Sequence, residues 1–150
     1  MLIIYCDGAC RGNGKDNSRG GWAYAILQGD ILLSRGSGGE KNTTNQRMEL
    51  QAAIEGIQAA RRNFPLSQIE IFTDSAYLCN CFTQNWWKAW EKNDWVNSKK
   101  EPVANQDLWK ILVAWFSEGN IKISKVRGHC NVPLNEMVDK MACAAADKLK

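Results

Sequence analysis

The chain has 150 residues, of which 45% are hydrophobic and 23% are charged, and its formal net charge is +3. This composition is typical of one compact globular domain and excludes collagen-like, fibrous and disordered chains. Its apolar runs are far shorter than the roughly 20 residues that a membrane span needs, and its start, Met1–Asp7, lacks the basic segment of a signal peptide. We therefore expect a single domain, residues 1–150, that resides in the cytoplasm.

Three strands are predicted near the start of the chain. The first, 2–7, is a short apolar run that ends in Asp-Gly, and the second, 20–27, alternates bulky with small apolar residues. A third strand, 30–36, follows through a Gly29-Asp30 hairpin turn. The polar, glycine-rich residues 11–20 are expected to form the loop between the first two strands.

The rest of the chain is predicted to alternate helices with two more strands. Thr44 or Asn45 caps a helix that ends before Phe64-Pro65. After a strand at 67–73 come a helix from about 75, a tryptophan-rich segment through 95, a helix at 105–116, a strand at 121–126 and a helix at 134–149. The helical periodicity predicts these buried positions: Leu50, Ala53, Ile54 and Ile57; Leu108, Ile111, Leu112 and Trp115; Met137, Met141 and Ala145. This order predicts an α/β fold with a mixed sheet, its first three strands antiparallel, flanked by helices.

Six cysteines raise the alternative of a disulfide framework or a zinc site. They include no Cys-x-x-Cys pair, and the chain holds a single histidine, His129. Without an export signal, we interpret them as reduced thiols, most of them buried.

Four carboxylates occupy positions that suggest metal binding. Asp7 and Asp74 each end a predicted buried strand, Glu49 lies near the start of its helix, and Asp139 lies among apolar residues of the last helix. Taken singly, each has an ordinary explanation as a turn, a helix cap or a surface residue. Together they favour hard divalent cations such as Mg²⁺, which bind carboxylate oxygens, and even a pair of ions about 4 Å apart.

Four motifs, in order along the chain, resemble the ribonuclease H type 1 family: 5–10 (YCDGAC), 43–50 (TTNQRMEL), 72–75 (FTDS) and 126–129 (VRGH). The resemblance runs from Leu2 to about Lys148. It implies a five-stranded mixed sheet with helices on both faces. It also implies an endonuclease that cleaves the RNA strand of RNA–DNA hybrids with two Mg²⁺ ions, for which Mn²⁺ can substitute, leaving 5′-phosphate and 3′-hydroxyl ends.

The resemblance assigns roles to individual residues. Asp7, Glu49, Asp74 and Asp139 correspond to the acidic quartet that holds the metal pair, with Asp7 shared by both ions. The ions supply an activated water and stabilise the leaving 3′ oxygen. His129 corresponds to a histidine that assists proton transfer or product release, a task that its ordinary pKa suits.

The same resemblance implies the substrate contacts. Amide side chains can both donate to and accept from 2′-hydroxyls. The implied contacts with the RNA strand are Asn13, Asn45 and Gln46, with backbone groups around Cys10; those with the DNA strand are Thr44 and Asn105 at a phosphate and Trp86, near Tyr77, along the channel wall.

Two departures from the family pattern stand out. Residues 86–101 carry a net charge of only +1 where relatives carry a strongly basic segment, and Ala76 stands where some relatives have glutamine. The first departure puts tight binding of the hybrid in doubt, whereas the acidic quartet is intact.

We expect a monomer that acts on RNA–DNA hybrids, without membrane attachment or an appended hybrid-binding domain. Three alternatives stay open. One is another nuclease or strand-transfer enzyme of the same fold, the second is a catalytically weak hybrid-binding module, and the third is a zinc- or redox-regulated interaction protein built on the cysteines.

Overall fold

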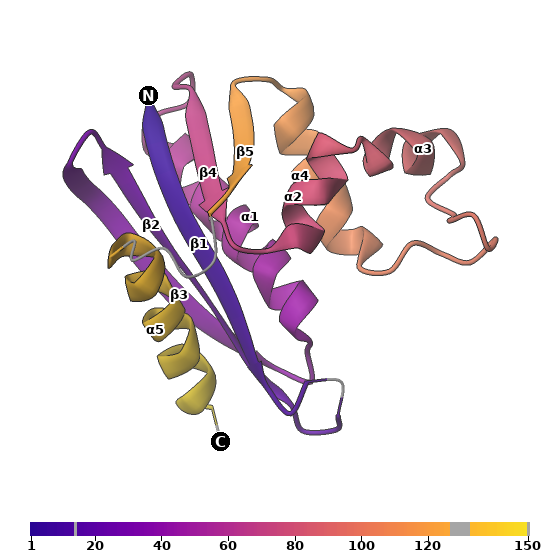
Figure 1. Ribbon diagram of the computed structural model, residues 1–150, viewed down its shortest axis with the longest axis horizontal. Helices are drawn as coiled ribbons and strands as arrows, with labels where there is room; N and C mark the ends of the chain where they lie inside the picture. The colour runs from indigo at the N-terminus through magenta and orange to yellow at the C-terminus, as the bar shows by residue number, and fades with distance from the viewer. Residues whose placement is uncertain (14, 127–132, 150) are drawn as a thin grey trace.

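The computed structural model describes residues 1–13, 15–126 and 133–149. In this part of the chain five strands form one sheet in the order β3-β2-β1-β4-β5 (Figure 1). β1 pairs antiparallel with β2, and β2 with β3, whereas β4 pairs parallel with both β1 and β5. The predicted mixed sheet with three antiparallel strands is confirmed. The strands are β1 Leu2–Arg11, β2 Arg19–Gln28, β3 Ile31–Lys41, β4 Ile69–Thr73 and β5 Ile121–Lys125.

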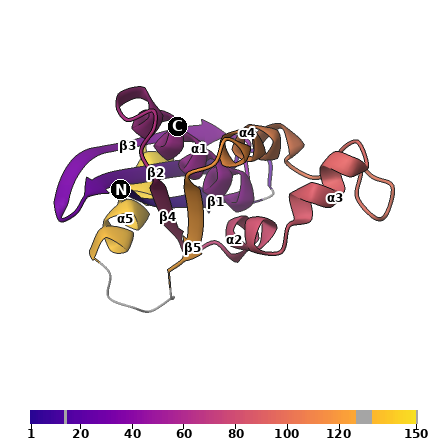
Figure 2. The same ribbon diagram turned by 90° about the horizontal axis from the view of Figure 1, so that it is seen from above.

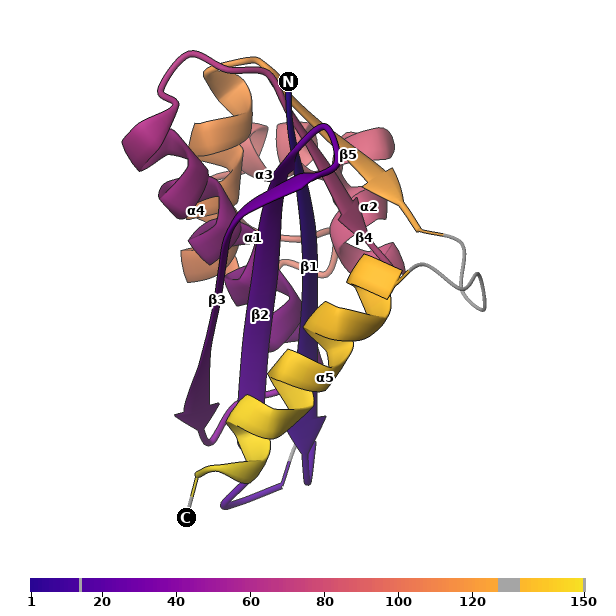
Figure 3. The ribbon, with the colours of Figure 1, turned by 90° about the vertical axis from the view of Figure 1, so that its left-hand side faces the viewer.

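Helices cover both faces of the sheet, as expected. α5 lies across β1, β2 and β3 on one face, and α1 and α4 lie behind the sheet on the other (Figure 3). α3 projects away from the sheet (Figure 2). No helix in the described part of the chain is long and apolar enough to cross a membrane. The helices are α1 Asn45–Asn63, α2 Ala76–Thr83, α3 Trp86–Lys92, α4 Gln106–Ser117 and α5 Pro133–Asp147.

The alternation in β2 places a hydrophobic core on each side of the sheet. Ile26 belongs to the larger core, against which Trp22 and Tyr24 also pack and to which α1, α2 and α4 contribute. The small residues Ala23 and Ala25 face the second core, beneath α5. Successive strand residues point to opposite faces, so one strand serves both cores.

The buried stripes of two helices differ from the prediction by about one residue. In α5 the most buried residues are Val138, Ala142 and Ala146 instead of Met137, Met141 and Ala145, which are half-buried. Gly21 lets α5 approach β2 closely, since a Cβ at this position would collide with the backbone of Ala142 and Ala146. The small residues of α5 therefore lie against the sheet. The stripe predicted for α1 is confirmed, since its four residues are all buried.

In α4 the prediction for Ile111 is wrong. This side chain is 39% exposed, and Trp115 is only half-buried. Trp109 and Val113 are buried in their place, because the Trp109 ring packs on Tyr77 and Phe82 of α2.

The first three strands are longer than their apolar runs. The ladder between β1 and β2 continues to the pair Arg11–Arg19, which shortens the predicted loop, and β3 runs on to Lys41. These extensions consist of small and polar residues, so backbone pairing alone defines them. Near the start of β3, Ile26 pairs with Ser34 and Leu27 with Leu32, which leaves Leu33 as an extra residue that forms a bulge.

The cysteines agree with the interpretation as thiols. Among the described residues, these five are free: Cys6, Cys10, Cys79, Cys81 and Cys143. Cys130 lies outside the described residues.

Candidate active site

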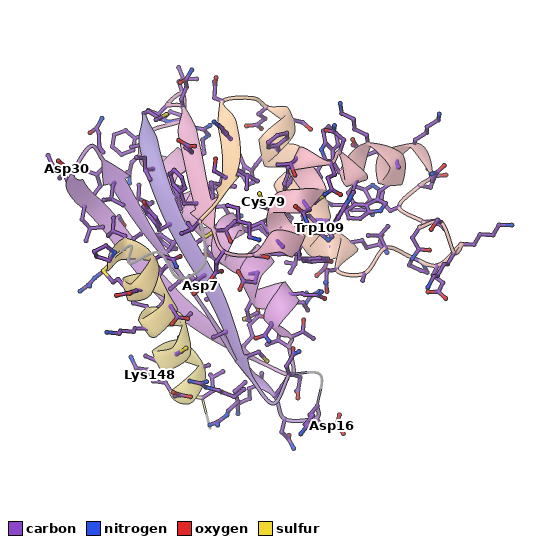
Figure 4. The ribbon with its side chains drawn as sticks, viewed as in Figure 1. Asp7, Asp16, Asp30, Cys79, Trp109 and Lys148 are labelled. Carbon is purple, nitrogen blue, oxygen red and sulfur yellow. The ribbon has the colours of Figure 1, made fainter. Side chains whose placement is uncertain are left out.

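Asp7 lies on β1 beside the end of β4. The parallel ladder between the two strands has its last pair at Tyr5 and Phe72, and β4 ends at Thr73 while β1 continues. Figure 4 shows Asp7 at this point of the sheet. The side chain is only 3% exposed, and its Oδ1 accepts a hydrogen bond from the Gly8 N–H at 2.9 Å. Asp74 follows β4 directly and is exposed, so the strand order brings two carboxylates to one place.

Glu49 reaches the same place from the first part of α1. This helix passes so close to β1 that a Cβ at position 8 would collide with the backbone of Met48 and Glu49. Glycine at position 8 therefore permits the approach. One carboxylate oxygen from each of Asp7, Glu49 and Asp74 lies within 4.8 Å of the others.

The remaining two predicted catalytic residues are Asp139 and His129. Asp139 is exposed on α5, not set among apolar side chains as the sequence suggested, and it lies within hydrogen-bonding reach of Asp7. It therefore borders the cluster of three. His129 lies outside the described residues.

Burial and mutual repulsion favour protonated carboxyl groups in the metal-free cluster. The pKa of Asp7 rises from 3.8 to about 8, first because of burial and then because of the charge of Asp74 and the contact with Asp139. Burial also raises the pKa of Glu49 well above its ordinary value, and the charges of Asp7 and Asp74 add to this effect. The fully buried Cys6 thiol behind the cluster has its pKa raised by burial and by the same carboxylates. A positive ion would relieve this repulsion.

The donor set fits a hard divalent cation. All the clustered ligands are carboxylate oxygens, which is the chemistry that Mg²⁺ and Mn²⁺ prefer. In addition, Glu49 Oε2 is buried and has no hydrogen-bond partner among the residues that the structure describes. A buried, unpaired acceptor is costly, and a bound cation would satisfy it.

The predicted RNA-strand contacts gather at the start of α1. Asn13 Oδ1 accepts a hydrogen bond from the Asn45 N–H at 2.8 Å, so the loop after β1 meets the helix start. Asn45 and Gln46 are exposed there. Cys10 lies alongside, with its Sγ 3.6 Å from the Thr43 carbonyl oxygen. The structure thus brings these four predicted residues to one surface.

The predicted DNA-strand contacts are joined by residues to which the sequence analysis gave no role. Thr44 caps α1 by accepting from the Arg47 N–H at 3.2 Å, and the Arg47 guanidinium donates to Asn105 Oδ1 at 3.3 Å. Asp107 holds the same guanidinium through contacts of 3.0 and 2.7 Å. Arg47 thereby connects the start of α1 with the start of α4. An arginine three residues after a helix cap is the sequence signal that could have suggested this link.

Tyr77 and Trp86 continue this surface. Tyr77 Oη accepts hydrogen bonds from Asn105 Nδ2 at 3.2 Å and Trp109 Nε1 at 2.9 Å. The Tyr77 and Trp86 ring centroids lie 6.4 Å apart. Trp109, which is missing from the predicted buried stripe of α4, supports Tyr77 by donating to its hydroxyl and by packing edge-on against its ring.

Tryptophan rings attach the projecting α3 to the rest of the molecule. The Trp90 ring lies 5.5 Å from that of Trp109, 6.2 Å from that of Trp86 and 5.9 Å from that of Trp95. α3 itself has no fully buried residue. Trp90 therefore connects α3 with Trp109 of α4, and Trp86, also half-buried, lies beside Tyr77.

Comparisons with known proteins agree on one family. The sequence pattern of the RNase H family matches residues 1–147. The chain is 44% identical to the ribonuclease H of Symbiobacterium thermophilum over 96% of this chain and 93% of that protein. Among solved structures, LC9-RNase H1, a type 1 RNase H with the type 2 active-site motif, has a TM-score of 0.84 at 26% identity, covering 99% of this chain and 73% of that one. LC11-RNase H1, solved in complex with an RNA/DNA hybrid, has a TM-score of 0.75 at 21% identity, covering 99% and 98%.

Proposed function

This chain belongs to the ribonuclease H family, and we propose that it hydrolyses the RNA strand of RNA–DNA hybrids with two Mg²⁺ ions, leaving 5′-phosphate and 3′-hydroxyl ends. The observation that carries the proposal is the carboxylate cluster, in which Asp7, Glu49 and Asp74 converge from three elements. Four carboxylates would be unnecessary for a module that only binds hybrids.

Asp7, Glu49, Asp74 and Asp139 would hold the ions. When bound, Mg²⁺ supplies a nucleophile from water at neutral pH and stabilises the charge that develops on the leaving oxygen. Because the pKa values of Asp7 and Glu49 are raised, metal binding has to displace protons from these carboxyl groups. The chain's part is to keep the carboxylates close before the metal arrives, and His129 would move a proton during turnover or help the product to leave.

The surface around the start of α1 would distinguish the two strands. Asn13, Asn45 and Gln46 would contact 2′-hydroxyls of the RNA strand, beside the backbone near Cys10, and their exposure at the start of α1 supports this. The DNA strand would be held on the other side of the helix start, by these residues: Thr44, Asn105, Tyr77 and Trp86.

The test is cleavage of a hybrid labelled on its RNA strand, compared with duplex RNA and duplex DNA, each with and without Mg²⁺. We expect cleavage of the hybrid alone, and only with the metal. Glu49→Gln should reduce the rate by about 100-fold or more, because it removes a metal ligand. The matched control is Glu55→Gln on the same helix, where Glu55 accepts a hydrogen bond from Gln51 and lies outside the cluster.

Binding of the hybrid without cleavage would favour the binding-module alternative. Cleavage of duplex DNA or duplex RNA at a similar rate would favour another nuclease of this fold.

A further inference from the structure

The Tyr77 hydroxyl makes hydrogen bonds whose directions can be assigned from chemistry alone. Its oxygen lies 2.9 Å from Trp109 Nε1 and 3.2 Å from Asn105 Nδ2. An indole N–H can only donate. Tyr77 Oη therefore accepts from Trp109.

The orientation of the Asn105 amide is fixed by Arg47. A guanidinium has no acceptor, so the Asn105 atom that faces Arg47 Nη1 at 3.3 Å has to be the amide oxygen. The amide nitrogen consequently faces Tyr77 and donates to it. Asp107 holds Arg47 in this position with two contacts, and the hydrogen bonding and the charge of this aspartate raise the pKa of the guanidinium. The arrangement cannot be inverted by flipping the amide.

Both lone pairs of Tyr77 Oη are thus occupied, and its own hydrogen has to point elsewhere. Trp109 and Asn105 both belong to the start of α4, so the hydrogen points away from that helix. The structure records no acceptor for it among residues 1–13, 15–126 and 133–149. The ring is also fixed, since it meets the Trp109 ring edge-on at 5.1 Å. A positioned donor on a half-buried side chain is left for a ligand.

The groups around Tyr77 share this donor character. Thr44 Oγ1 accepts from the Arg47 N–H, so its hydroxyl hydrogen is also free to donate. One N–H of the Asn105 amide has no acceptor in the described part of the chain, while the amide oxygen is already engaged by Arg47. A group of donors is the arrangement that binds an oxyanion, and the nearby Asp107 carboxylate is engaged by the Arg47 guanidinium.

We propose that the Tyr77 hydroxyl donates a hydrogen bond to a backbone phosphate oxygen of the bound hybrid, so that Tyr77 contributes a polar contact in addition to its ring. This inference rests on the proposed function, because the hybrid supplies the phosphate.

The first experiment compares Tyr77→Phe with Tyr24→Phe as a matched control. Tyr24 is half-buried on β2, where its ring stacks on the Trp22 ring with centroids 6.3 Å apart. Loss of a hydrogen bond to a charged oxygen should raise the Michaelis constant (KM) of Tyr77→Phe, and weaken metal-free binding of the hybrid, by about 10-fold. The turnover number (kcat) should stay within about twofold, because the lost contact would bind the ground state and the transition state equally. The control should match the wild type.

The second experiment separates a phosphate contact from a structural effect. Tyr77→Phe also deprives Trp109 and Asn105 of their acceptor, so urea unfolding should show a loss of stability in any case. Hybrids are therefore prepared with one neutral methylphosphonate at a time, in the DNA strand in one series and at 2′-O-methyl positions of the RNA strand in the other. We expect one position at which the methylphosphonate weakens binding to the wild type but adds nothing in Tyr77→Phe.

The strand that carries this position identifies the phosphate. Additive effects at every position of both strands, or an unchanged KM in Tyr77→Phe, would overturn the inference. Either result leaves hybrid cleavage by the wild-type protein intact, whereas failure of the proposed function would show as wild-type protein that does not cleave the hybrid.

Discussion

Gly8 and Glu49 lie in direct backbone contact, with no space between β1 and α1 for a side chain at position 8. This contact sets the distance from Asp7, the preceding residue, to the carboxylate of Glu49. The geometry of the site therefore depends on the absence of a Cβ as much as on the presence of carboxylates.

Gly8→Ala should displace the start of α1 and separate Glu49 from Asp7. Overpacking of this kind typically costs about 1–3 kcal/mol of unfolding free energy, and we expect hybrid cleavage to fall further than the stability loss explains. Urea unfolding and steady-state cleavage measure the two effects. Gly12→Ala is the control, because a Cβ there has space and only its left-handed φ of 70° is unfavourable. Equal activity of the two variants would contradict the importance of the contact.

Asp7→Asn should abolish hybrid cleavage and stabilise the metal-free protein. The pKa of Asp7 is about 8 in the folded protein and near 3.8 in the unfolded chain. The protonated carboxyl therefore stabilises the fold fully below about pH 4, and this contribution is lost as the pH rises through about 8. At pH 8 in EDTA, urea unfolding should show the variant to be more stable by up to about 6 kcal/mol, since the pKa shift is about four units and each corresponds to about 1.4 kcal/mol.

At pH 4 the difference in stability from Asp7→Asn should nearly vanish. Asp30→Asn, in the exposed turn between β2 and β3, should change neither stability nor activity. Normal turnover of Asp7→Asn in Mg²⁺ would exclude the assignment of Asp7 as a metal ligand.

His129→Ala should slow turnover by about 10–100-fold without eliminating it, because a proton carrier assists a reaction that the metal ions already promote. Single-turnover cleavage and its pH profile measure the effect. Complete inactivity, with folding and metal binding unchanged, would mean that His129 has a more essential part.

The combination of Glu91→Lys with Asp94→Lys should lower the KM for the hybrid and steepen its dependence on salt. Both residues are exposed on α3 and the turn after it, and each new phosphate contact releases about one more counterion. The kcat should change little, because α3 projects away from the sheet that carries the carboxylates (Figure 2). A salt titration with unchanged KM and slope would show that this segment does not face the nucleic acid.

Trp86→Ala should raise the KM while leaving the salt slope almost unchanged. An aromatic ring that packs on a nucleotide contributes about 1–3 kcal/mol without releasing ions. The same salt titration tests this. A changed slope would mean that the substitution disturbs the charged residues of α3 instead of removing a packing contact.

The sequence was sufficient to predict the described elements other than α3 and to place three carboxylates together. Asp7 and Asp74 each follow a run of apolar strand residues, and parallel strands bring their ends to one edge. The helix cap at Thr44 fixes where α1 begins, and Glu49 is brought near these two residues by its place close to that start. Local sequence patterns were therefore enough to predict these positions, and the fold agrees with the patterns.

What the sequence could not predict depends on contacts between distant segments. The role of Arg47 requires Asp107 and Asn105, which lie 60 and 58 residues further on. The rotation of the α5 stripe toward Ala142 follows from the missing side chain at Gly21. Periodicity gives the angle of an apolar stripe only approximately, because the partner surface decides which residues approach it most closely.

The bulge at Leu33 has a consequence for the behaviour of the protein in concentrated solution. β3 ends the sheet, and the exposed fractions of Ile31, Leu32 and Leu33 are 67%, 42% and 39%. An apolar edge of this kind can recruit a strand from another molecule and start aggregation. The extra residue breaks the regular spacing of backbone donors and acceptors at the most apolar point of the edge. We therefore expect the irregular strand to disfavour edge-to-edge pairing between copies of the chain, although its apolar side chains are in contact with water.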